Sequence, residues 1–177
     1  MHDDEAVVGD VYIGAGETDI VRLLARAARE IQKQHPDIRY HISSGNAEHV
    51  LEQLDKGLID FGLLFGRTDT QKYEALPLPG KDTWGVLMRR DVPLAEKASV
   101  APGDLLEKPL ILTDQPDDAQ LLTRWLSPAG GAPHVVATYI LVYNASLLVD
   151  EGLGYALCLD RLINTDGSRL CFRPLSP

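Results

Sequence analysis

One stretch decides the fold, residues 11–66, which reads VYIGAGETDIVRLLARAAREIQKQHPDIRYHISSGNAEHVLEQLDKGLIDFGLLFG. Short β-rich segments at 11–13, 38–42 and 58–65 alternate with two segments whose apolar residues recur at helical spacing. Because parallel neighbours need a crossover connection, the order strand, helix, strand, helix, strand predicts a parallel sheet covered by helices. The last segment is nearly all apolar, so we expect a strand that is covered on both faces.

The remainder of the chain predicts a second α/β half. Strands are expected at 73–78, 83–89, 110–112, 135–139, 154–159 and 169–173, with helices opened by Asp117 and Asp118 and by Asn144. The segment after Asn46 and the segment after Asn144 each lead through a glycine, Gly57 or Gly152, to a buried strand. This repeat favours two similar lobes, although the frequency of glycine after helices explains it equally well.

Composition excludes several classes of protein. The chain has 177 residues, a net charge of -9 and two cysteines, which argues against a disulfide framework and against nucleic-acid binding by this chain alone. No apolar run approaches the roughly 20 residues that span a bilayer, so we expect no membrane partner. The start, Met1–Glu5, is acidic where a secretory signal would be basic and then apolar. These features predict a cytoplasmic location.

Two loops after predicted parallel strands are candidate ligand sites. Thr18 follows the small residues of 14–16, and Ser43, Ser44 and Asn46 form the next such loop. Both loops precede helices, whose N-termini offer unpaired N–H groups and a partial positive charge to an anion. Both also leave the carboxyl ends of strands, the edge where open α/β sheets bind ligands. The alternative is that Thr18 and Asn46 only cap their helices.

A third loop, Thr113-Asp114-Gln115, follows a predicted strand of the second half and precedes a helix. It is a candidate for the opposite wall of a binding cleft. The alternative is a polar turn before a helix capped by Asp117 or Asp118.

Other chemistry is not supported by the sequence. The glycine-rich segment 14–19 has Asp19 where a dinucleotide fingerprint needs its third glycine, and no acidic residue ends the second strand. The histidines show no metal-ligand spacing, and Cys158 and Cys171 are expected to be inert core thiols. Asp60 is expected at the entry of its strand, bound by backbone. We therefore predict no catalytic residue, no metal and no cofactor.

The chain resembles the effector-binding domain of LysR-type transcriptional regulators. The similarity begins at Gly9–Gly14 and continues through Gly45-Asn46 and the segment Gly57-Leu58-Ile59-Asp60-Phe61-Gly62. It passes the turn Val92-Pro93-Leu94 and ends at Val149–Leu157. Single motifs are loose, but their order and spacing are fairly specific, and they cover residues 9 to about 160.

The resemblance implies an α/β, type II periplasmic-binding-protein-like fold of two lobes joined by two crossover strands. Residues 1–8 would then be a lead-in, 9–80 the first lobe and 81–167 the second lobe. Residues 168–177 would form a strand returning toward the first lobe, with the C-terminal part of that lobe absent. An exposed edge and apolar face on the first lobe would favour self-association.

The resemblance also implies a small-molecule effector in the interlobe cleft, such as a carboxylate, an amino acid or an aromatic acid. Promoter DNA would be bound only by an N-terminal winged helix-turn-helix domain that this chain lacks, in a homodimer or homotetramer. By position, Phe65, Gly66 and the segment Tyr139–Leu141 join the loops described above. The predicted effector-binding residues are Gly16, Thr18, Ser43, Ser44, Asn46, Phe65, Gly66, Thr113, Asp114, Gln115, Tyr139 and Leu141.

Two departures from the family pattern affect this site. Asp160-Arg161 stands where a proline is common, which predicts a charged rim, and Glu17 beside Thr18 would repel an anion. Two other functions on the same fold stay open. A lyase of prephenate-dehydratase type would need an acid in the cleft, for which Glu17 and Asp114 are candidates. An exported solute-binding protein is disfavoured by the absence of a signal.

Overall fold

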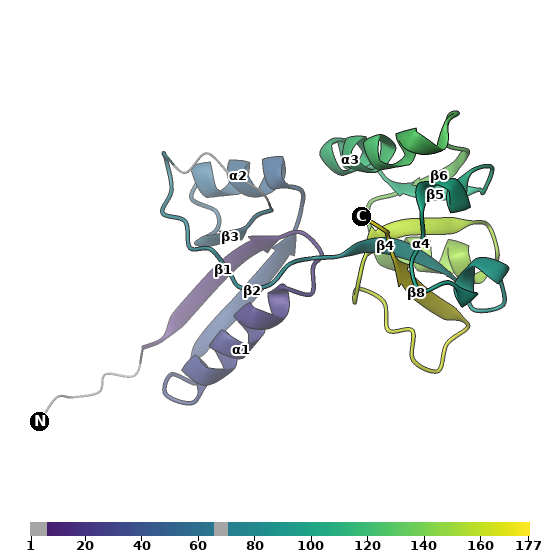
Figure 1. Ribbon diagram of the computed structural model, residues 1–177. Helices are drawn as coiled ribbons and strands as arrows, with labels where there is room; N and C mark the ends of the chain where they lie inside the picture. The colour runs from purple at the N-terminus through teal and green to yellow at the C-terminus, as the bar shows by residue number, and fades with distance from the viewer. Residues whose placement is uncertain (1–6, 66–70) are drawn as a thin grey trace, which may run out of the picture. The chain divides into compact units, whose positions relative to one another are not determined.

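The computed structural model describes residues 7–65 and 71–177. The chain divides into two compact α/β units, Met1–Lys81 and Asp82–Pro177 (Figure 1). Each unit has its own sheet and its own helices. Within the described residues, no helix combines the length and the apolarity that crossing a bilayer requires.

The first unit is a three-stranded parallel sheet with the strand order β2-β1-β3. Its elements are β1 (Gly9–Ala15), α1 (Val21–Gln32), β2 (Ile38–Ser44), α2 (Ala47–Asp55) and β3 (Phe61–Leu63). The strand-helix alternation therefore produces the parallel sheet that the sequence predicts. Helix α2 lies close on the sheet because β1 and β3 place glycines under it: a Cβ on Gly62 would lie 2.8 Å from a Val50 methyl carbon.

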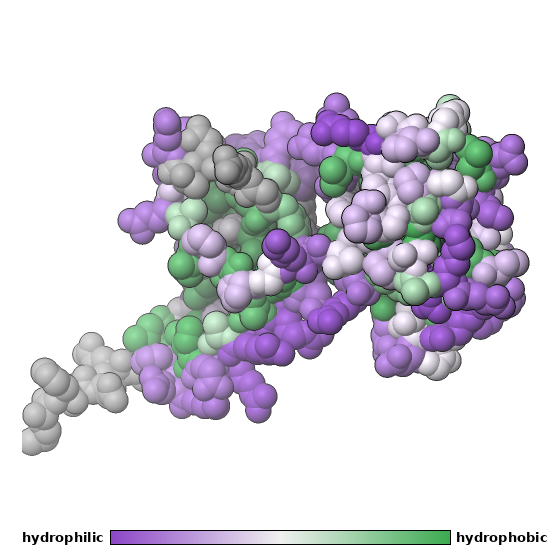
Figure 2. Space-filling model, viewed as in Figure 1, coloured by the Kyte–Doolittle hydropathy of each residue, from purple (hydrophilic) through white to green (hydrophobic). Residues whose placement is uncertain are grey.

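The predicted strand at 58–65 is only partly correct. β3 covers three residues, and it is an edge strand whose neighbours Leu58 and Phe65 are half or more exposed. Phe61 itself is 63% exposed, so the prediction of a strand covered on both faces is wrong. Helix α1 contributes no buried residue. Figure 2 shows the resulting hydrophobic surface on this unit. Helix α1 packs on the sheet only through half-buried side chains. The hydrophobic core of the first unit is therefore small.

The second unit is a five-stranded mixed sheet with the order β6-β5-β7-β4-β8. Its strands are β4 (Trp84–Arg89), β5 (Leu110–Thr113), β6 (Val135–Tyr139), β7 (Tyr155–Leu159) and β8 (Leu170–Pro174). Its helices are α3 (Pro116–Leu126) and α4 (Val142–Asp150), with short 3-10 helices at Pro93–Glu96, Pro102–Leu105 and Ser127–Ala129. β5, β6 and β7 are parallel, whereas β4 is antiparallel to both β7 and β8.

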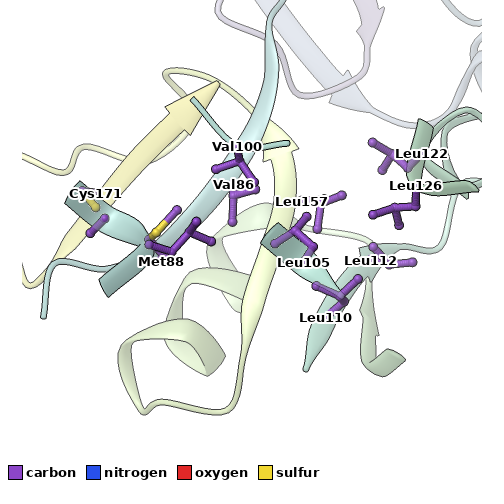
Figure 3. Close-up of a cluster of buried hydrophobic side chains, with 12 residues drawn as sticks. Val86, Met88, Val100, Leu105, Leu110, Leu112, Leu122, Leu126, Leu157 and Cys171 are labelled. Atoms are coloured by element: carbon purple, nitrogen blue, oxygen red, sulfur yellow. The ribbon is translucent and has the colours of Figure 1, made fainter. Parts of the chain in front are cut away.

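Alternation along β4 sends side chains to opposite faces of this sheet. Val86 and Met88 join a buried cluster with α3, and Leu87 joins a second cluster with α4. Because side chains of a strand alternate with period two, α3 and α4 lie on opposite faces. Figure 3 shows the first cluster, in which strand residues meet Leu122 and Leu126 of α3. The second unit thus has a three-layer core.

Several predicted boundaries in the second half are wrong. Residues 73–78 form no strand, because the prolines and bends of this segment leave it irregular. α4 begins at Val142, so Asn144 lies inside the helix and the repeat of the Asn46 cap is absent. Residues 170–174 pair with β4, so this strand completes the second sheet instead of joining the first. An antiparallel neighbour needs no crossover helix, which explains this short return.

Candidate effector site at the carboxyl ends of the parallel strands

Each unit has one point where the direction of strand addition reverses. In the first unit, α1 leads from β1 to β2, and α2 then leads back past β1 to β3. In the second unit, α3 leads from β5 to β6, and α4 leads back past β5 to β7. Ligands of open α/β sheets bind at the carboxyl ends of strands beside such switch points. The β1/β3 and β5/β7 strand ends are therefore the candidate sites.

The β1/β3 switch point brings three loop segments together. A Cβ on Gly16 would lie 3.4 Å from Phe65 Cε2 and 3.6 Å from the carbonyl oxygen of Gly45. The Gly45 amide donates to the carbonyl of Ala15 at 3.1 Å. The predicted residues Gly16 and Phe65 thus lie in contact, with the loop after β2 beside them. Gly66 lies outside the described residues.

Thr18 is a buried hydroxyl beside this edge. It is only 6% exposed, and its Oγ1 accepts a hydrogen bond from the Ile20 amide at 3.1 Å. α1 begins at Val21, and its N-cap residue Ile20 makes no side-chain cap. The alternative that Thr18 caps this helix is therefore wrong. The hydroxyl instead closes a turn ahead of the helix, because Ser and Thr side chains readily bond their own backbone two residues on.

The loop after β2 carries Ser43, Ser44 and Asn46. The Ser43 hydroxyl lies 3.4 Å from Gln53 Oε1 and 3.5 Å from the carbonyl of Ile13. Asn46 Oδ1 accepts from the His49 amide at 2.8 Å, which confirms that this residue caps α2. This loop belongs to the outer strand of the first sheet, so its side chains flank the switch point from one side only.

The β5/β7 switch point contains the same hydroxyl turn. Thr113 ends β5 and is 5% exposed, and its Oγ1 accepts from the Gln115 amide at 3.2 Å. The amide of Asp114 donates to the carbonyl of Tyr139 at 2.8 Å, and the side chain of Asp114 is exposed. In the first turn of α3, burial and the neighbouring Asp117 raise the pKa of Asp118.

Tyr139 lies at the carboxyl end of β6, and its side chain also makes a hydrogen bond within the sheet. Its hydroxyl donates to the carbonyl of Leu157 at 2.7 Å, although β7 is not the hydrogen-bonding neighbour of β6. The pairing of β5 with β7 ends at Ile111 and Ala156, so the tyrosine reaches the carbonyl just beyond that ladder. Leu141 precedes α4, is 44% exposed and makes no side-chain cap.

Asp160 and Arg161 were not among the predicted binding residues, yet they follow the carboxyl end of β7. The Asp160 amide donates to the carbonyl of Thr83 at 2.9 Å, and the Arg161 amide donates to Asp160 Oδ1 at 2.8 Å. Arg161 has a φ of 65°, which is uncommon for a residue with a side chain. This is the pair for which the departure from the family pattern predicts a charged rim.

Three features of the described residues concern chemistry other than ligand binding. In the described part of the chain, no group of three or more His, Cys, Asp and Glu residues could hold a metal ion. Burial raises the pKa of the Cys158 thiol to about 12, which makes it a poor nucleophile at neutral pH. Asp60 Oδ2 accepts from the Tyr12 amide at 2.8 Å, which confirms its predicted contact with backbone.

Comparison with known proteins gives one consistent result. The family model described as "LysR substrate binding domain" matches residues 5–177. The HTH-type transcriptional regulator YvbU of Bacillus subtilis (strain 168) is 26% identical over 150 residues, which are 85% of this chain and 50% of YvbU. The chain thus spans about half the length of the curated relative it matches.

Solved structures agree with this fold. The PA01 protein of Pseudomonas aeruginosa, described as a LysR family transcriptional regulator, has a TM-score of 0.79 at 21% identity. The match covers 99% of this chain and 66% of that protein. The effector binding domain of QuiR, solved with shikimate, has a TM-score of 0.78 at 17% identity, covering 96% of this chain and 82% of QuiR.

These matches confirm the type II periplasmic-binding-protein-like α/β fold and the predicted effector-binding role. They favour neither a lyase nor an exported solute-binding protein. Each of the two α/β units has polar residues beside a switch point, where open α/β sheets bind ligands. The chain belongs to the LysR substrate-binding domain family.

Proposed function

We propose that this chain senses a small molecule for a DNA-binding regulator and performs no chemistry on it. The supporting observation is the matched pair of switch points, each with a buried threonine whose hydroxyl oxygen accepts from an amide of its own turn. This bond orients each hydroxyl within its turn. Thr18 is therefore the proposed centre of a ligand-binding surface on the first unit, and Thr113 the proposed centre of one on the second unit.

The proposal extends to the whole protein. Promoter DNA would be bound by a helix-turn-helix segment such as the description of YvbU names, in a cytoplasmic homo-oligomer. The effector would act by binding one conformation of the regulator more tightly than another, because a ligand shifts an equilibrium only by its differential affinity. Coupling of about 1–3 kcal/mol suffices for such a switch.

A thermal-shift screen of metabolites against the chain tests the sensing role. A bound ligand at about 100 times its dissociation constant stabilises the fold by about 2.7 kcal/mol. We expect at least one compound to raise the melting temperature in a saturable manner and to be recovered unchanged. Turnover of the compound would support a lyase, and a screen without any saturable shift would contradict effector sensing.

Matched variants then test the site. Thr18→Ala and Ser43→Ala should weaken binding of the compound found in the screen by about tenfold, the value of one lost hydrogen bond. Thr123→Ala is the control, because its hydroxyl donates to the Ala119 carbonyl in the second half of α3. Equal affinity in all three variants would refute the assigned residues.

A further inference from the structure

Most of the described glycines in the first unit have a structural reason. A positive φ, which disfavours a side chain, applies to Gly9, Gly57 and Gly80. Close packing applies to Gly14, Gly45 and Gly62, where an added Cβ would lie only 2.4–2.8 Å from a side-chain carbon. Neither reason applies to Gly16, which follows β1 at the β1/β3 switch point.

The backbone and the neighbours of Gly16 would both accept a side chain. Its φ lies outside the positive region that favours glycine. A Cβ would lie 3.4 Å from Phe65 Cε2 and 3.6 Å from the Gly45 carbonyl oxygen, which are ordinary van der Waals distances. Alanine at such a position stabilises a fold, because it reduces the entropy of the unfolded chain. The glycine therefore costs stability, and the described part of the first unit does not account for it.

The absent side chain leaves a space for one small group beside Gly16. An aromatic carbon of Phe65 and the carbonyl oxygen of Gly45 border this space. Gly16 is partly exposed and Phe65 is 50% exposed, so a small molecule can reach it. The Gly45 amide donates to the Ala15 carbonyl at 3.1 Å, which holds the Gly45 peptide beside the end of β1.

The two borders of the space decide which chemical group fits. A carbonyl oxygen accepts a hydrogen bond from an O–H or N–H group, whereas a carboxylate has no proton to donate and carries a charge of the same sign as the oxygen. The exposed Phe65 ring offers an apolar contact to the framework that carries the group. An uncharged hydroxyl on a ring satisfies both requirements.

We propose that Gly16 is a specificity-determining residue whose missing side chain admits an uncharged hydrogen-bond donor of the ligand, such as a ring hydroxyl. This inference rests on the proposed sensing function and deepens it by naming the group that the first unit recognises. The hydroxyl donates to the Gly45 carbonyl, and the ring that carries it contacts Phe65. A side chain at position 16 would occupy the place of this hydroxyl.

The variants alter the space and leave the rest of the loop unchanged. Gly16→Ala fills it with a methyl group, and Gly16→Ser fills it with a hydroxyl that belongs to the protein. Phe65→Leu keeps an apolar side chain but removes the ring. Gly103→Ala is the matched control, because Gly103 also lacks a positive φ and a Cβ there meets no atom within 4 Å. Melting temperatures and amide NMR titrations of the 177-residue chain are the measurements.

The probe is phenol at neutral pH, an uncharged ring with one hydroxyl. Anisole lacks the O–H donor, and benzoate carries a charge in its place. We expect phenol to shift the amide resonances of Gly16 and Gly45 in a saturable manner, and anisole and benzoate to bind at least about tenfold more weakly.

The variants should separate binding from folding. Gly16→Ala and Gly16→Ser should lose at least about tenfold in phenol affinity, and Phe65→Leu should also bind phenol more weakly. Gly16→Ala should nevertheless melt at or above the wild-type temperature. Gly103→Ala should retain the full affinity for phenol.

Four outcomes would overturn the role of Gly16. These are unchanged phenol affinity in Gly16→Ala, a lowered melting temperature of that variant, equal binding of phenol and anisole, and no shift of the Gly16 and Gly45 resonances with phenol. A metabolite from the wider screen that binds Gly16→Ala as tightly as wild type would sink this inference and leave the sensing function intact. Failure of every compound in that screen would contradict the sensing function itself.

Discussion

At the scale of single residues, the polar side chains at the strand ends divide into two kinds. Tyr139 of β6 donates to the Leu157 carbonyl of β7, 18 residues further on, whereas Asn46 accepts from the His49 amide of the helix that it caps. Thr18 and Thr113 each accept from an amide two residues further on, within their own turn. Residue type and position after a strand predict both kinds equally. The partner of Tyr139 depends on a tertiary neighbour, which the sequence does not reveal.

The Asn46 cap gives a prediction at this scale. Asn46→Ala removes the acceptor of the His49 amide and should lower the free energy of unfolding by about 1 kcal/mol. Asn46→Asp should retain most of the stability, because a carboxylate accepts the same bond and favours a helix N-terminus. Urea unfolding monitored by circular dichroism measures both. An Asn46→Ala chain as stable as wild type would show that the cap contributes nothing.

A second residue-scale prediction concerns Gly154, which lies directly before the buried strand β7. A Cβ at this position would lie 2.5 Å from the carbonyl oxygen of Pro109, which accepts from the Tyr155 amide at 2.9 Å. Gly154→Ala should therefore cost about 1–3 kcal/mol, since backbone must move to admit the methyl group. Gly103→Ala serves as control, because a Cβ there meets no atom within 4 Å. Equal melting temperatures for the two variants would contradict the close approach.

At the scale of elements, an ionic network ties α4 to the strands β4 and β8. Arg169 Nη2 lies 2.7 Å from Asp150 Oδ2, and Arg89 Nη1 donates to the Asp150 carbonyl at 2.9 Å. Arg89 Nη2 also lies 2.7 Å from Asp91 Oδ2. The hydrogen bond from Arg169 lowers the pKa of Asp150, and the one from Arg89 lowers the pKa of Asp91.

This network predicts how stability depends on pH. A carboxyl whose pKa is lower in the folded state stabilises that state above its unfolded pKa, about 3.9 for Asp, and loses the contribution as pH falls through the folded pKa. Asp150→Asn should therefore reduce stability at neutral pH and flatten the loss of stability in acid. Urea midpoints measured from neutral to acidic pH check this. If the variant and wild-type curves run parallel, Asp150 is not linked to folding.

The sequence predicted helices and strands correctly where the hydrophobic periodicity agreed with the positions of residues that end helices, such as glycine. The order of strands and helices in the first unit, and the glycines that end α2 and α4 with φ of 66° and 84°, follow from local pattern. It failed at 73–78 and 58–65, where short apolar runs do not distinguish a strand from an irregular or exposed segment. The direction of β8 depends on pairing with β4, which no local pattern encodes.

At the scale of the whole molecule, the two units differ in how much apolar surface they bury. The second unit contains both buried clusters, on opposite faces of its sheet. The first unit relies on a few buried side chains and on a helix, α1, without any buried residue. Since burial of apolar surface is the main stabilising contribution, the isolated units should not be equally stable.

Hydrogen exchange of the 177-residue chain measures this difference. Amides of β4, β5 and β7 should exchange most slowly, and those of β1, β2 and β3 should exchange faster, through opening of the first unit alone. Val50→Ala, at the centre of the first unit, should speed exchange there and leave the second unit unaffected. Equal protection of all strands would show that the chain unfolds as one cooperative body.

The position of the two cysteines has a practical consequence. Cys158 and Cys171 are 2% and 3% exposed, both belong to the second unit, and the pKa of Cys158 is about 12. A thiol-specific dye can therefore react with these cysteines only after the second unit has unfolded, whether or not the first unit is still folded. The natural thiols thus report the timing of this event without any introduced label.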